Sequence, residues 1–274
     1  GLVPLIASAD LVVVVGSELA EVDLWRAELG HDAPMIRVDI DPEALAGCGP
    51  RDLPVPGDAG AFLDGMLERL PDPVAASGWQ EDEIARARAA FRAEADAERP
   101  GIVPIAEALA AGLPDDTMIY SDMTQFAYVA KGVWPMTRPG HWHHPFGFGT
   151  LGYALPAAIG GAVARPGLPT LAIAGDYGFQ YTLQELATAV ELGLPLPILI
   201  WDNAKLGEIE ASMQAAQIAP NAVTARNPDF LALARAYGAG AVQPGSVSAL
   251  VDAVNGAFSA GGPTLIRVTP DIVG

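Results

Sequence analysis

Two oxygen-bearing side chains close two apolar runs in the stretch GDYGFQYTLQELATAVELGLPLPILIWDN, residues 175–203. Asp176 follows TLAIAG and Asn203 follows LPILIWD. Their separation of 27 positions leaves room for one helical crossover between neighbouring parallel strands. A hard cation such as Mg²⁺ binds carboxylate and amide oxygens and is completed by phosphate and water. The spacing therefore indicates a site for a metal ion and a phosphate.

The residues that follow the first run favour an anion at the same place. Gly175, Tyr177 and Gly178 are expected to form a turn whose backbone N–H groups face an anion before the next helix. A helix N-cap or an Asx-turn would also explain Asp176. Both interpretations, a metal–phosphate site and a capping site, stay open on these residues alone.

Bringing these strand ends together requires a parallel sheet. From residue 101 onward, apolar runs alternate with helical patterns, which predicts an α/β fold whose parallel sheets have helices on both faces. Ligands bind beyond the carboxyl ends of such strands, where Asp122 also lies. Strands are predicted at 117–122, 170–176, 196–203 and 263–271, and helices at 102–113, 149–164, 182–193, 228–238 and 248–260.

The first hundred residues have a separate organisation. Strands are predicted at 11–15 and 35–40 and a short helix at 62–70. We expect a partial domain at 1–70, a linker and charged helix at 71–100, and a second domain at 101–274. Because the first strand starts within about ten residues of the first residue, we expect the chain to begin inside a domain.

Composition excludes several classes of function. The net charge of −18 argues against nucleic acid, whose phosphates need Lys and Arg. No apolar run reaches the roughly 18 residues of a membrane helix, so no membrane partner is expected. A single cysteine, Cys48, fits a reducing compartment, and the first residues do not resemble a signal peptide. We therefore expect a cytoplasmic protein.

The same stretch resembles the thiamine-diphosphate signature, in which G-D-G is followed about 27 residues later by N-N. GFGTLGYALPAAIGGAVA and QELATAVELGLPLPILIWDN are similar to the acetolactate synthase-like family, and the likeness covers 101–271. Tyr177 and Asp202 depart from the pattern, which usually has Gly and Asn there. The resemblance implies a thiamine-diphosphate-binding fold preceded by part of a Rossmann-like central domain.

The resemblance also assigns roles to particular residues. It implies that Asp176, Asn203 and the backbone carbonyl of Lys205 bind Mg²⁺, which bridges the two phosphates of thiamine diphosphate. The carbonyl of Gly149 would accept a hydrogen bond from the 4′-amino group, and Leu151 would hold the cofactor in its V shape unless it is ordinary core. The remaining implied cofactor contacts are Met123, Thr124 and Gln125, for which helix capping is the alternative, and Gly175, Tyr177, Gly178, Leu206 and Gly207.

Two further stretches carry weaker signals. HWHH, from His141 to His144, lacks standard zinc spacing and favours a structural or substrate-loop role, in which His144 could still donate a proton to substrate. Residues 1–70 resemble the back half of the family's central domain, where some members bind FAD or ADP. Asp39 and Asp41 could face a ribose there, although the motif is too weak to support either nucleotide.

The catalytic carboxylate of the resembled family is missing. In that family a Glu of an N-terminal pyrimidine-binding domain acts on N1′ of the cofactor, and nothing in the chain resembles that domain. It would come from a partner polypeptide in a homo- or hetero-oligomer, or from a part removed by cleavage or truncation. The resemblance implies decarboxylation or carboligation of a small 2-oxo acid, and the alternative is a non-catalytic or regulatory cofactor-binding subunit.

Within the family, LIWDNAKLGEI followed by MQAAQI resembles ketoarginine decarboxylases more than acetolactate synthases. Asp202, with Glu208 or Glu210, could favour a cationic substrate tail. The alternative is that these acids are solvated helix positions.

Overall fold

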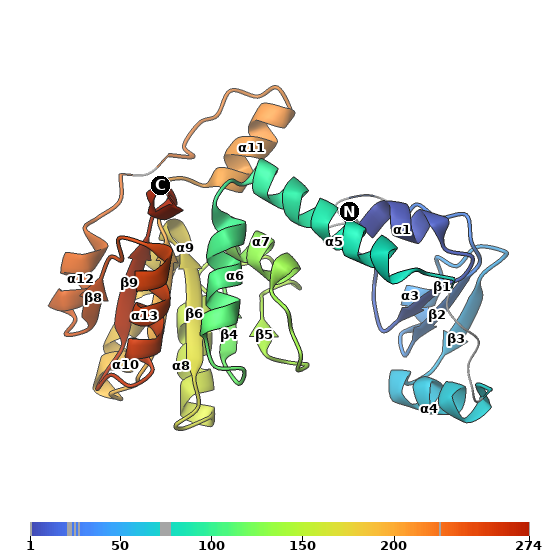
Figure 1. The fold of residues 1–274 in the computed structure, drawn as a ribbon, viewed down its shortest axis with the longest axis horizontal. Coiled ribbons are helices and arrows are strands. Elements are labelled where there is room, and N and C mark those ends of the chain that lie inside the picture. The colour runs from blue at the N-terminus through green and yellow to red at the C-terminus, as the bar shows by residue number, and fades with distance from the viewer. Residues whose placement is uncertain are drawn as a thin grey trace. The chain divides into compact units, whose positions relative to one another are not determined.

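The computed structural model describes residues 2–20, 24, 26, 28–71, 78–224 and 226–273. They form two compact units, Gly1–Glu94 and Ala95–Gly274. The division lies within helix α5 (Glu81–Glu98) rather than at Pro100. Most of the predicted linker, residues 72–77, lies outside the described residues. Figure 1 follows the chain through both units.

The first unit contains a three-stranded parallel sheet in the order β1–β2–β3. The two predicted strands are present as β1 (Val12–Val15) and β2 (Met35–Asp39). β3 (Leu53–Pro56) was not predicted, because its two prolines are unusual outside a sheet edge. The helices described in this unit are α1 (Leu2–Ser8), α3 (Pro42–Leu45) and α4 (Ala59–Arg69).

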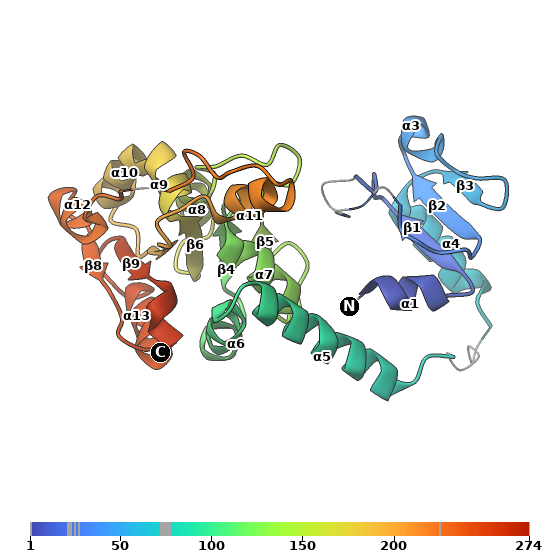
Figure 2. The same ribbon diagram turned by 90° about the horizontal axis from the view of Figure 1, so that it is seen from above.

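The second unit contains a six-stranded, fully parallel sheet in the order β5–β4–β6–β7–β9–β8. In Figure 2, α8, α10 and α12 cover one face, and α6 and α13 cover the other. The predicted α/β class is thereby confirmed. The strands are β4 (Met118–Ser121), β5 (Trp142–His143), β6 (Thr170–Gly175), β7 (Pro197–Trp201), β8 (Gly240–Val242) and β9 (Thr264–Val268). The helices are α6 (Ile102–Gly112), α7 (Gln125–Val133), α8 (Ala154–Ala164), α9 (Asp176–Tyr181), α10 (Leu186–Glu191), α11 (Gly207–Ala215), α12 (Phe230–Ala236) and α13 (Val247–Ala257), with 3₁₀ turns at Leu183–Glu185 and Pro270–Val273.

Several predicted boundaries differ from the observed ones. The helix predicted from residue 149 begins at Ala154 and leaves 149–153 as a loop. Gly175 to Gly178 were predicted as a turn, but helix α9 begins at Asp176. The prediction also missed α7 and the two strands β5 and β8, which are short and occupy the sheet edges.

The core of the second unit lies around β6 and β7, which are buried along their whole length. Helix α8 approaches this sheet closely because Gly161 faces the ring of Tyr120, where a Cβ would overlap the ring.

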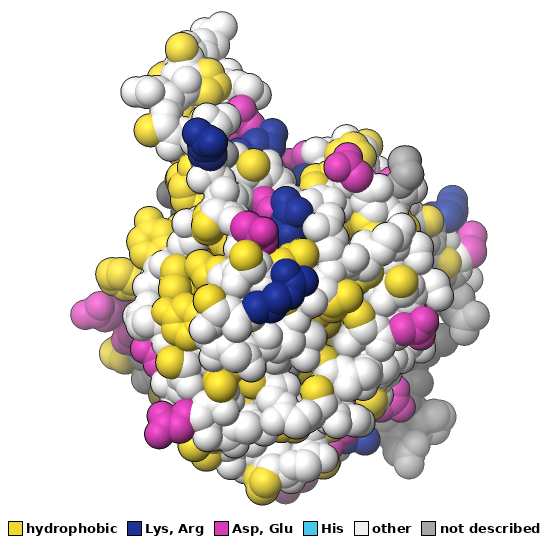
Figure 3. All heavy atoms as spheres, turned by 90° about the vertical axis from the view of Figure 1, so that its left-hand side faces the viewer, with side chains coloured by type: hydrophobic (Ala, Val, Ile, Leu, Met, Phe, Trp, Pro, Cys, Tyr) yellow, Lys and Arg dark blue, Asp and Glu magenta, His cyan; other side chains and the backbone are white. Residues whose placement is uncertain are grey.

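On the face drawn in Figure 3, acidic side chains are scattered singly among neutral and hydrophobic ones. None of the helices within the described residues combines the length and hydrophobicity of a transmembrane span.

A buried carboxylate fixes the start of α8. Asp122 follows β4, is 1% exposed, and accepts hydrogen bonds from the backbone N–H groups of Gly152, Tyr153 and Ala154 at 3.1, 2.6 and 3.0 Å. Burial raises the pKa of Asp122, and the three bonds oppose this shift. These bonds satisfy N–H groups that have no partner inside the helix, so α8 begins where Asp122 can reach it.

We predict that Asp122→Ala lowers the free energy of unfolding by about 3 kcal/mol, because it leaves buried N–H groups without acceptors. Urea denaturation of both proteins measures the change. Asp115→Ala, which removes an exposed carboxylate nearby, is the control and should change stability by less than about 0.5 kcal/mol. Equal stability of the two variants would contradict the anchoring role of Asp122.

Candidate cofactor site

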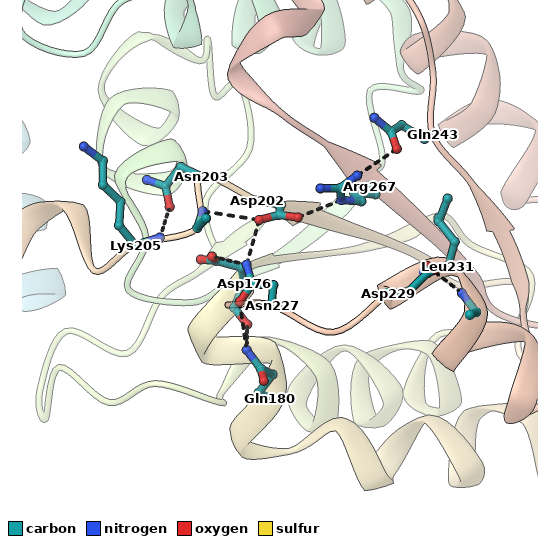
Figure 4. A network of polar contacts seen from close by, with 12 residues as sticks. Asp176, Gln180, Asp202, Asn203, Lys205, Asn227, Asp229, Leu231, Gln243 and Arg267 are labelled. Carbon is teal, nitrogen blue, oxygen red and sulfur yellow. Dashed lines mark hydrogen bonds and ion pairs between the residues drawn. The ribbon is translucent and has the colours of Figure 1, made fainter. Parts of the chain in front are cut away.

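Three neighbouring strands of the second unit each lead into a buried aspartate. Asp122 follows β4, Asp176 follows β6 and Asp202 follows β7, with exposures of 1%, 2% and 5%. Gly175 and Trp201 are paired across β6 and β7, so Asp176 and Asp202 leave the sheet at the same level. Asn203 comes next along the chain, which places the two predicted side-chain ligands at adjacent strand ends (Figure 4).

Asp176 and Asp202 are joined by one side chain that sequence reasoning missed. Asn227 Nδ2 donates to Asp176 Oδ2 at 2.6 Å and to Asp202 Oδ1 at 2.8 Å. Arg267 Nε donates to the other oxygen of Asp202 at 2.6 Å. Burial raises the pKa of Asp176, the bond from Asn227 opposes it, and the charge of Asp202 adds to the rise. Asp176 is the first residue of α9 and Gly175 is its N-cap, so Asp176 does not serve as the N-cap.

The segment after β7 is a tight turn. Ala204 has a positive φ of 56°, an uncommon conformation for a residue with a Cβ. Two side chains support it: Asp202 Oδ1 accepts from the N–H of Ala204, and Asn203 Oδ1 accepts from the N–H of Lys205, each at 3.3 Å. This turn brings Asn203 and the backbone of Lys205 to the same strand end.

A polar relay holds Asn203 from the other side. Asn203 Nδ2 donates to Gln125 Oε1 at 3.0 Å, and Gln125 Nε2 donates to Glu208 Oε1 at 3.0 Å. Arg99 binds both oxygens of Glu208 at 2.7 and 2.8 Å. Burial opposes ionisation of Glu208, but the bonds from Arg99 and Gln125 outweigh it and lower the pKa of this carboxyl. The relay orients the Asn203 amide with Nδ2 toward Gln125.

Three consecutive predicted contacts, Met123, Thr124 and Gln125, each lie against a different predicted glycine. A Cβ on Gly149 would lie 3.6 Å from Met123 Cε, and one on Gly175 would lie 3.1 Å from Thr124 Oγ1. A Cβ on Gly207, the first residue of α11, would overlap the side chain of Gln125. Thr124 is the N-cap residue of α7 but makes no side-chain capping bond, so helix capping does not explain it. This short segment therefore packs against the loop at Gly149, the end of β6 and the start of α11.

Leu151 lies in a loop bent by two glycines in the left-handed region, Gly149 at φ 61° and Gly152 at φ 85°. Leu151 is partly exposed and is not among the fully buried residues of the second unit. Thr182 Oγ1 donates to the Gly152 carbonyl at 2.9 Å and fixes the loop together with Asp122. Gly178 approaches Asp122 so closely that a Cβ would overlap its carboxylate.

Each ring of the HWHH stretch contacts a structural partner, and Trp142 and His144 share one. His141 Nε2 lies 3.1 Å from Asp116 Oδ1, and His143 stacks on Tyr120. His144 Nδ1 lies 2.8 Å from Ser121 Oγ, which also accepts from the Trp142 indole at 2.8 Å.

His144 itself is held neutral. Burial and Lys131 lower the pKa of His144 to about 4, so the ring is uncharged at neutral pH. Its buried Nε2 has no hydrogen-bond partner. Among the described residues, no cluster of three or more His, Cys, Asp or Glu side chains could hold a metal ion.

The acids proposed to attract a cationic tail already have partners. Asp202 pairs with Arg267, Glu208 with Arg99, and Glu210 with Lys205 Nζ at 2.7 Å. They are therefore not solvated helix positions, and their charges are neutralised within the second unit.

Asp39 and Asp41, the two acids that could face a nucleotide ribose, accept hydrogen bonds from backbone groups close to them in sequence. Asp39 Oδ1 accepts from the N–H of Asp41, and Asp41 Oδ1 accepts from the N–H of Glu43, both at 2.9 Å. Asp41 is thereby the N-cap of α3.

Sequence reasoning missed Asn227, Gln180, Arg99 and Arg267. Asn-Pro at 227–228 indicates only a turn before α12, and an arginine inside an apolar strand such as β9 indicates only that it needs a partner. Neither signal identifies the carboxylate that each residue contacts. Tyr177, which departs from the usual motif, lines an open pocket of about 290 Å³ with Gln180, Tyr181, Arg226 and Asn227.

Fold and site together define an α/β domain that gathers polar groups and close-packed glycines at the carboxyl edge of a parallel sheet. Residues 122–268, more than half of the chain, match the family described as thiamine pyrophosphate enzyme, C-terminal TPP binding domain. The chain belongs to this family, the thiamine-diphosphate-dependent enzymes that include 2-oxo acid decarboxylases and acetolactate synthases.

The chain is 42% identical over 265 residues to the probable 2-ketoarginine decarboxylase AruI of Pseudomonas aeruginosa, covering 96% of the chain and 47% of that protein. It is 30% identical to the acetolactate synthase isozyme 3 large subunit of Escherichia coli, covering 84% and 42%. The closer resemblance to ketoarginine decarboxylases is therefore confirmed. The chain spans about half the length of these relatives.

A solved structure of benzoylformate decarboxylase from Polynucleobacter necessarius has the same fold. It superimposes with a TM-score of 0.73 at 22% identity, covering 98% of this chain and 50% of that one.

We predict that Leu151→Ala leaves thiamine diphosphate affinity unchanged but lowers kcat about 100-fold in the assembled enzyme, because a misplaced reacting group costs that order of rate. Calorimetry measures the affinity, and decarboxylation of a 2-oxo acid measures turnover. Leu192→Ala, at an exposed leucine after α10, is the matched control. Wild-type turnover in Leu151→Ala would show that the side chain has no role in positioning the cofactor.

Proposed function

We propose that this chain forms the diphosphate- and Mg²⁺-binding half of a thiamine-diphosphate-dependent enzyme that decarboxylates or ligates a 2-oxo acid. The observation that carries the proposal is the meeting of Asp176 and the Asn203 turn at the ends of β6 and β7. Family membership supports the cofactor. The buried edge supports a ligand whose charge offsets that of the carboxylates.

The donor set suits this metal. Asp176 supplies a carboxylate, Asn203 an amide oxygen and Lys205 a backbone carbonyl, and all three are hard oxygen ligands of the kind Mg²⁺ selects. Asn203 Oδ1 already faces away from Gln125, because Gln125 accepts from Nδ2. The diphosphate would lie against Gly175, Tyr177, Gly178, Leu206 and Gly207 on one side and against Met123, Thr124 and Gln125 on the other.

The loop after β5 would receive the organic part of the cofactor. When bound, thiamine diphosphate supplies an electron sink for breaking and forming carbon–carbon bonds next to a carbonyl. Gly149 would offer its carbonyl to the 4′-amino group, and Leu151 would set the angle between the two rings. Asp122 holds this loop through the N–H of Gly152 and the start of α8, which keeps Leu151 in a fixed position.

The carboxylate that acts on N1′ would come from a pyrimidine-binding domain outside these 274 residues, carried by a partner chain or by another part of the same polypeptide. In this proposal the first unit is the back half of a central domain, and the cofactor lies where the diphosphate and pyrimidine domains meet in an oligomer. The similarity to a protein named as a 2-ketoarginine decarboxylase makes a guanidino-bearing 2-oxo acid the first substrate to test. Since Asp202, Glu208 and Glu210 are paired, recognition of a cationic tail would need groups other than these three.

We predict that Asp176→Ala abolishes Mg²⁺-dependent binding of thiamine diphosphate, because the metal–diphosphate cluster loses its anionic protein ligand. Calorimetry with both ligands in the assembled enzyme measures this. Asp252→Ala removes an exposed carboxylate from α13 and should bind as the wild type does. If Asp176→Ala binds with wild-type affinity, the metal assignment is wrong.

We also predict that residues 1–274 alone do not turn over a 2-oxo acid at saturating cofactor, and that activity appears when a chain carrying the pyrimidine-binding domain is added. The reason is the missing N1′ carboxylate. Decarboxylation is followed with and without the second chain, and size-exclusion chromatography gives the assembly. A monomeric, active 1–274 would overturn this account. Cofactor binding without turnover in the presence of the second chain would favour a regulatory subunit.

A further inference from the structure

Asn227 lies between α11 and α12, on a segment that the proposed ligand set does not include. Its amide nitrogen donates to two buried carboxylates, at 2.6 Å to Asp176 and at 2.8 Å to Asp202. Figure 4 shows the Asn227 side chain between these two aspartates. The contact therefore bridges the ends of β6 and β7.

The surrounding groups fix the orientation of this amide. The two hydrogens on Nδ2 match two carboxylate oxygens, which only accept hydrogen bonds when ionised. The amide oxygen of Asn227 faces Gln180 Nε2 at 3.4 Å, and Gln180 Nε2 also donates to the Asp176 carbonyl at 3.0 Å. A flipped Asn227 would place its oxygen against both carboxylates, so the network permits one orientation.

Arg267 binds one oxygen of Asp202 and Asn227 binds the other, so the arginine fixes the carboxylate that holds Asn227. Arg267 of β9 donates through Nε to Asp202 Oδ2 at 2.6 Å and through Nη1 to Gln243 Oε1 at 2.9 Å. Asp202 is 5% exposed, and a carboxylate buried to this extent needs partners such as this arginine. An amide at position 202 would present its oxygen to one of the two donors, Arg267 and Asn227, and its NH₂ to the other, where no hydrogen bond can form. A carboxylate accepts from both at once.

We propose that Asn227 is a positioning residue for Asp176, and that Arg267 acts through Asp202 to hold Asn227 in the required orientation. The inference rests on the proposed function, in which Asp176 binds Mg²⁺. By holding Oδ2, Asn227 fixes the plane of the Asp176 carboxylate before the metal arrives. Hydrogen-bonded partners of this kind typically contribute about 10- to 100-fold to metal affinity.

The test is a Mg²⁺ titration of the assembled enzyme at saturating thiamine diphosphate, with cofactor uptake measured by calorimetry. Asn227→Ala should raise the Mg²⁺ concentration for half-saturation about 10- to 100-fold. Excess Mg²⁺ should restore full uptake, although the loss of the bonds to buried Asp176 and Asp202 should lower the unfolding midpoint of the metal-free protein. Asn221→Ala, at an exposed asparagine of the same segment, is the matched control and should titrate as the wild type does.

A second variant, at Arg267, tests the chain of contacts from Arg267 through Asp202 to Asn227. It can be used if Asn227→Ala fails to fold. Arg267→Gln should raise the same half-saturation concentration by a smaller factor, and combining it with Asn227→Ala should add little. Fully multiplicative effects would overturn the coupling through Asp202.

The remaining outcomes separate this inference from the proposed function. Wild-type half-saturation in Asn227→Ala, or a loss that excess Mg²⁺ does not reverse, overturns the positioning role while Asp176→Ala still abolishes binding. If the wild type takes up no cofactor, or Asp176→Ala binds normally, the proposed function fails and this inference fails with it.

Discussion

The burial of three carboxylates at one edge of a sheet is the constraint on which the second unit depends. Asp122, Asp176 and Asp202 follow neighbouring strands, and each is at most 5% exposed. Removing a charge from water is costly unless hydrogen bonds or an opposite charge compensate for it. Each aspartate must therefore draw a partner to the strand ends, and those partners come from segments distant in sequence.

The three carboxylates have different partners and therefore stabilise different parts of the second unit. Among the described residues, Asp122 accepts from three backbone N–H groups, which sets the start of α8 and the loop before it. Asp202 takes an arginine and an amide, which ties β9 and the segment before α12 to β7. Within the described residues, Asp176 has one side-chain partner, Asn227, and no cationic side chain bonded to it. This difference from Asp202, in addition to its position, supports the proposal that Asp176 is a metal ligand.

The sequence predicted the parts of this arrangement that depend on local pattern. Apolar runs such as LPILIWDN place Asn203 after a strand, and the 27-residue spacing predicts that Asp176 shares its edge. The start of α8 and the roles of Asn227 and Arg267 depend on side-chain contacts between residues 25 to 65 positions apart. Such contacts have no local signature, because an asparagine before a proline looks like any turn. The short strand β5 was missed for a related reason: its two residues show no alternation and are defined by pairing with β4.

Asn203 and Asp176, the two predicted side-chain ligands, are each held by a series of polar contacts, and the two series use different residue types. Asn203 is held by Gln125, Glu208 and Arg99, and Asp176 by Asn227, Asp202 and Arg267. The Asn203 relay ends in Arg99, which pairs with Glu208 and also with Glu98, and the Asp176 relay ends in Arg267, which pairs with Asp202. This arrangement gives a physical reason for an aspartate at position 202. The residue faces a guanidinium on one side and an amide NH₂ on the other, and only a side chain that accepts in both directions satisfies them. The departure of Asp202 from the usual motif therefore fits the relay and need not weaken the site, since the metal would meet Asp176 and Asn203 rather than Asp202.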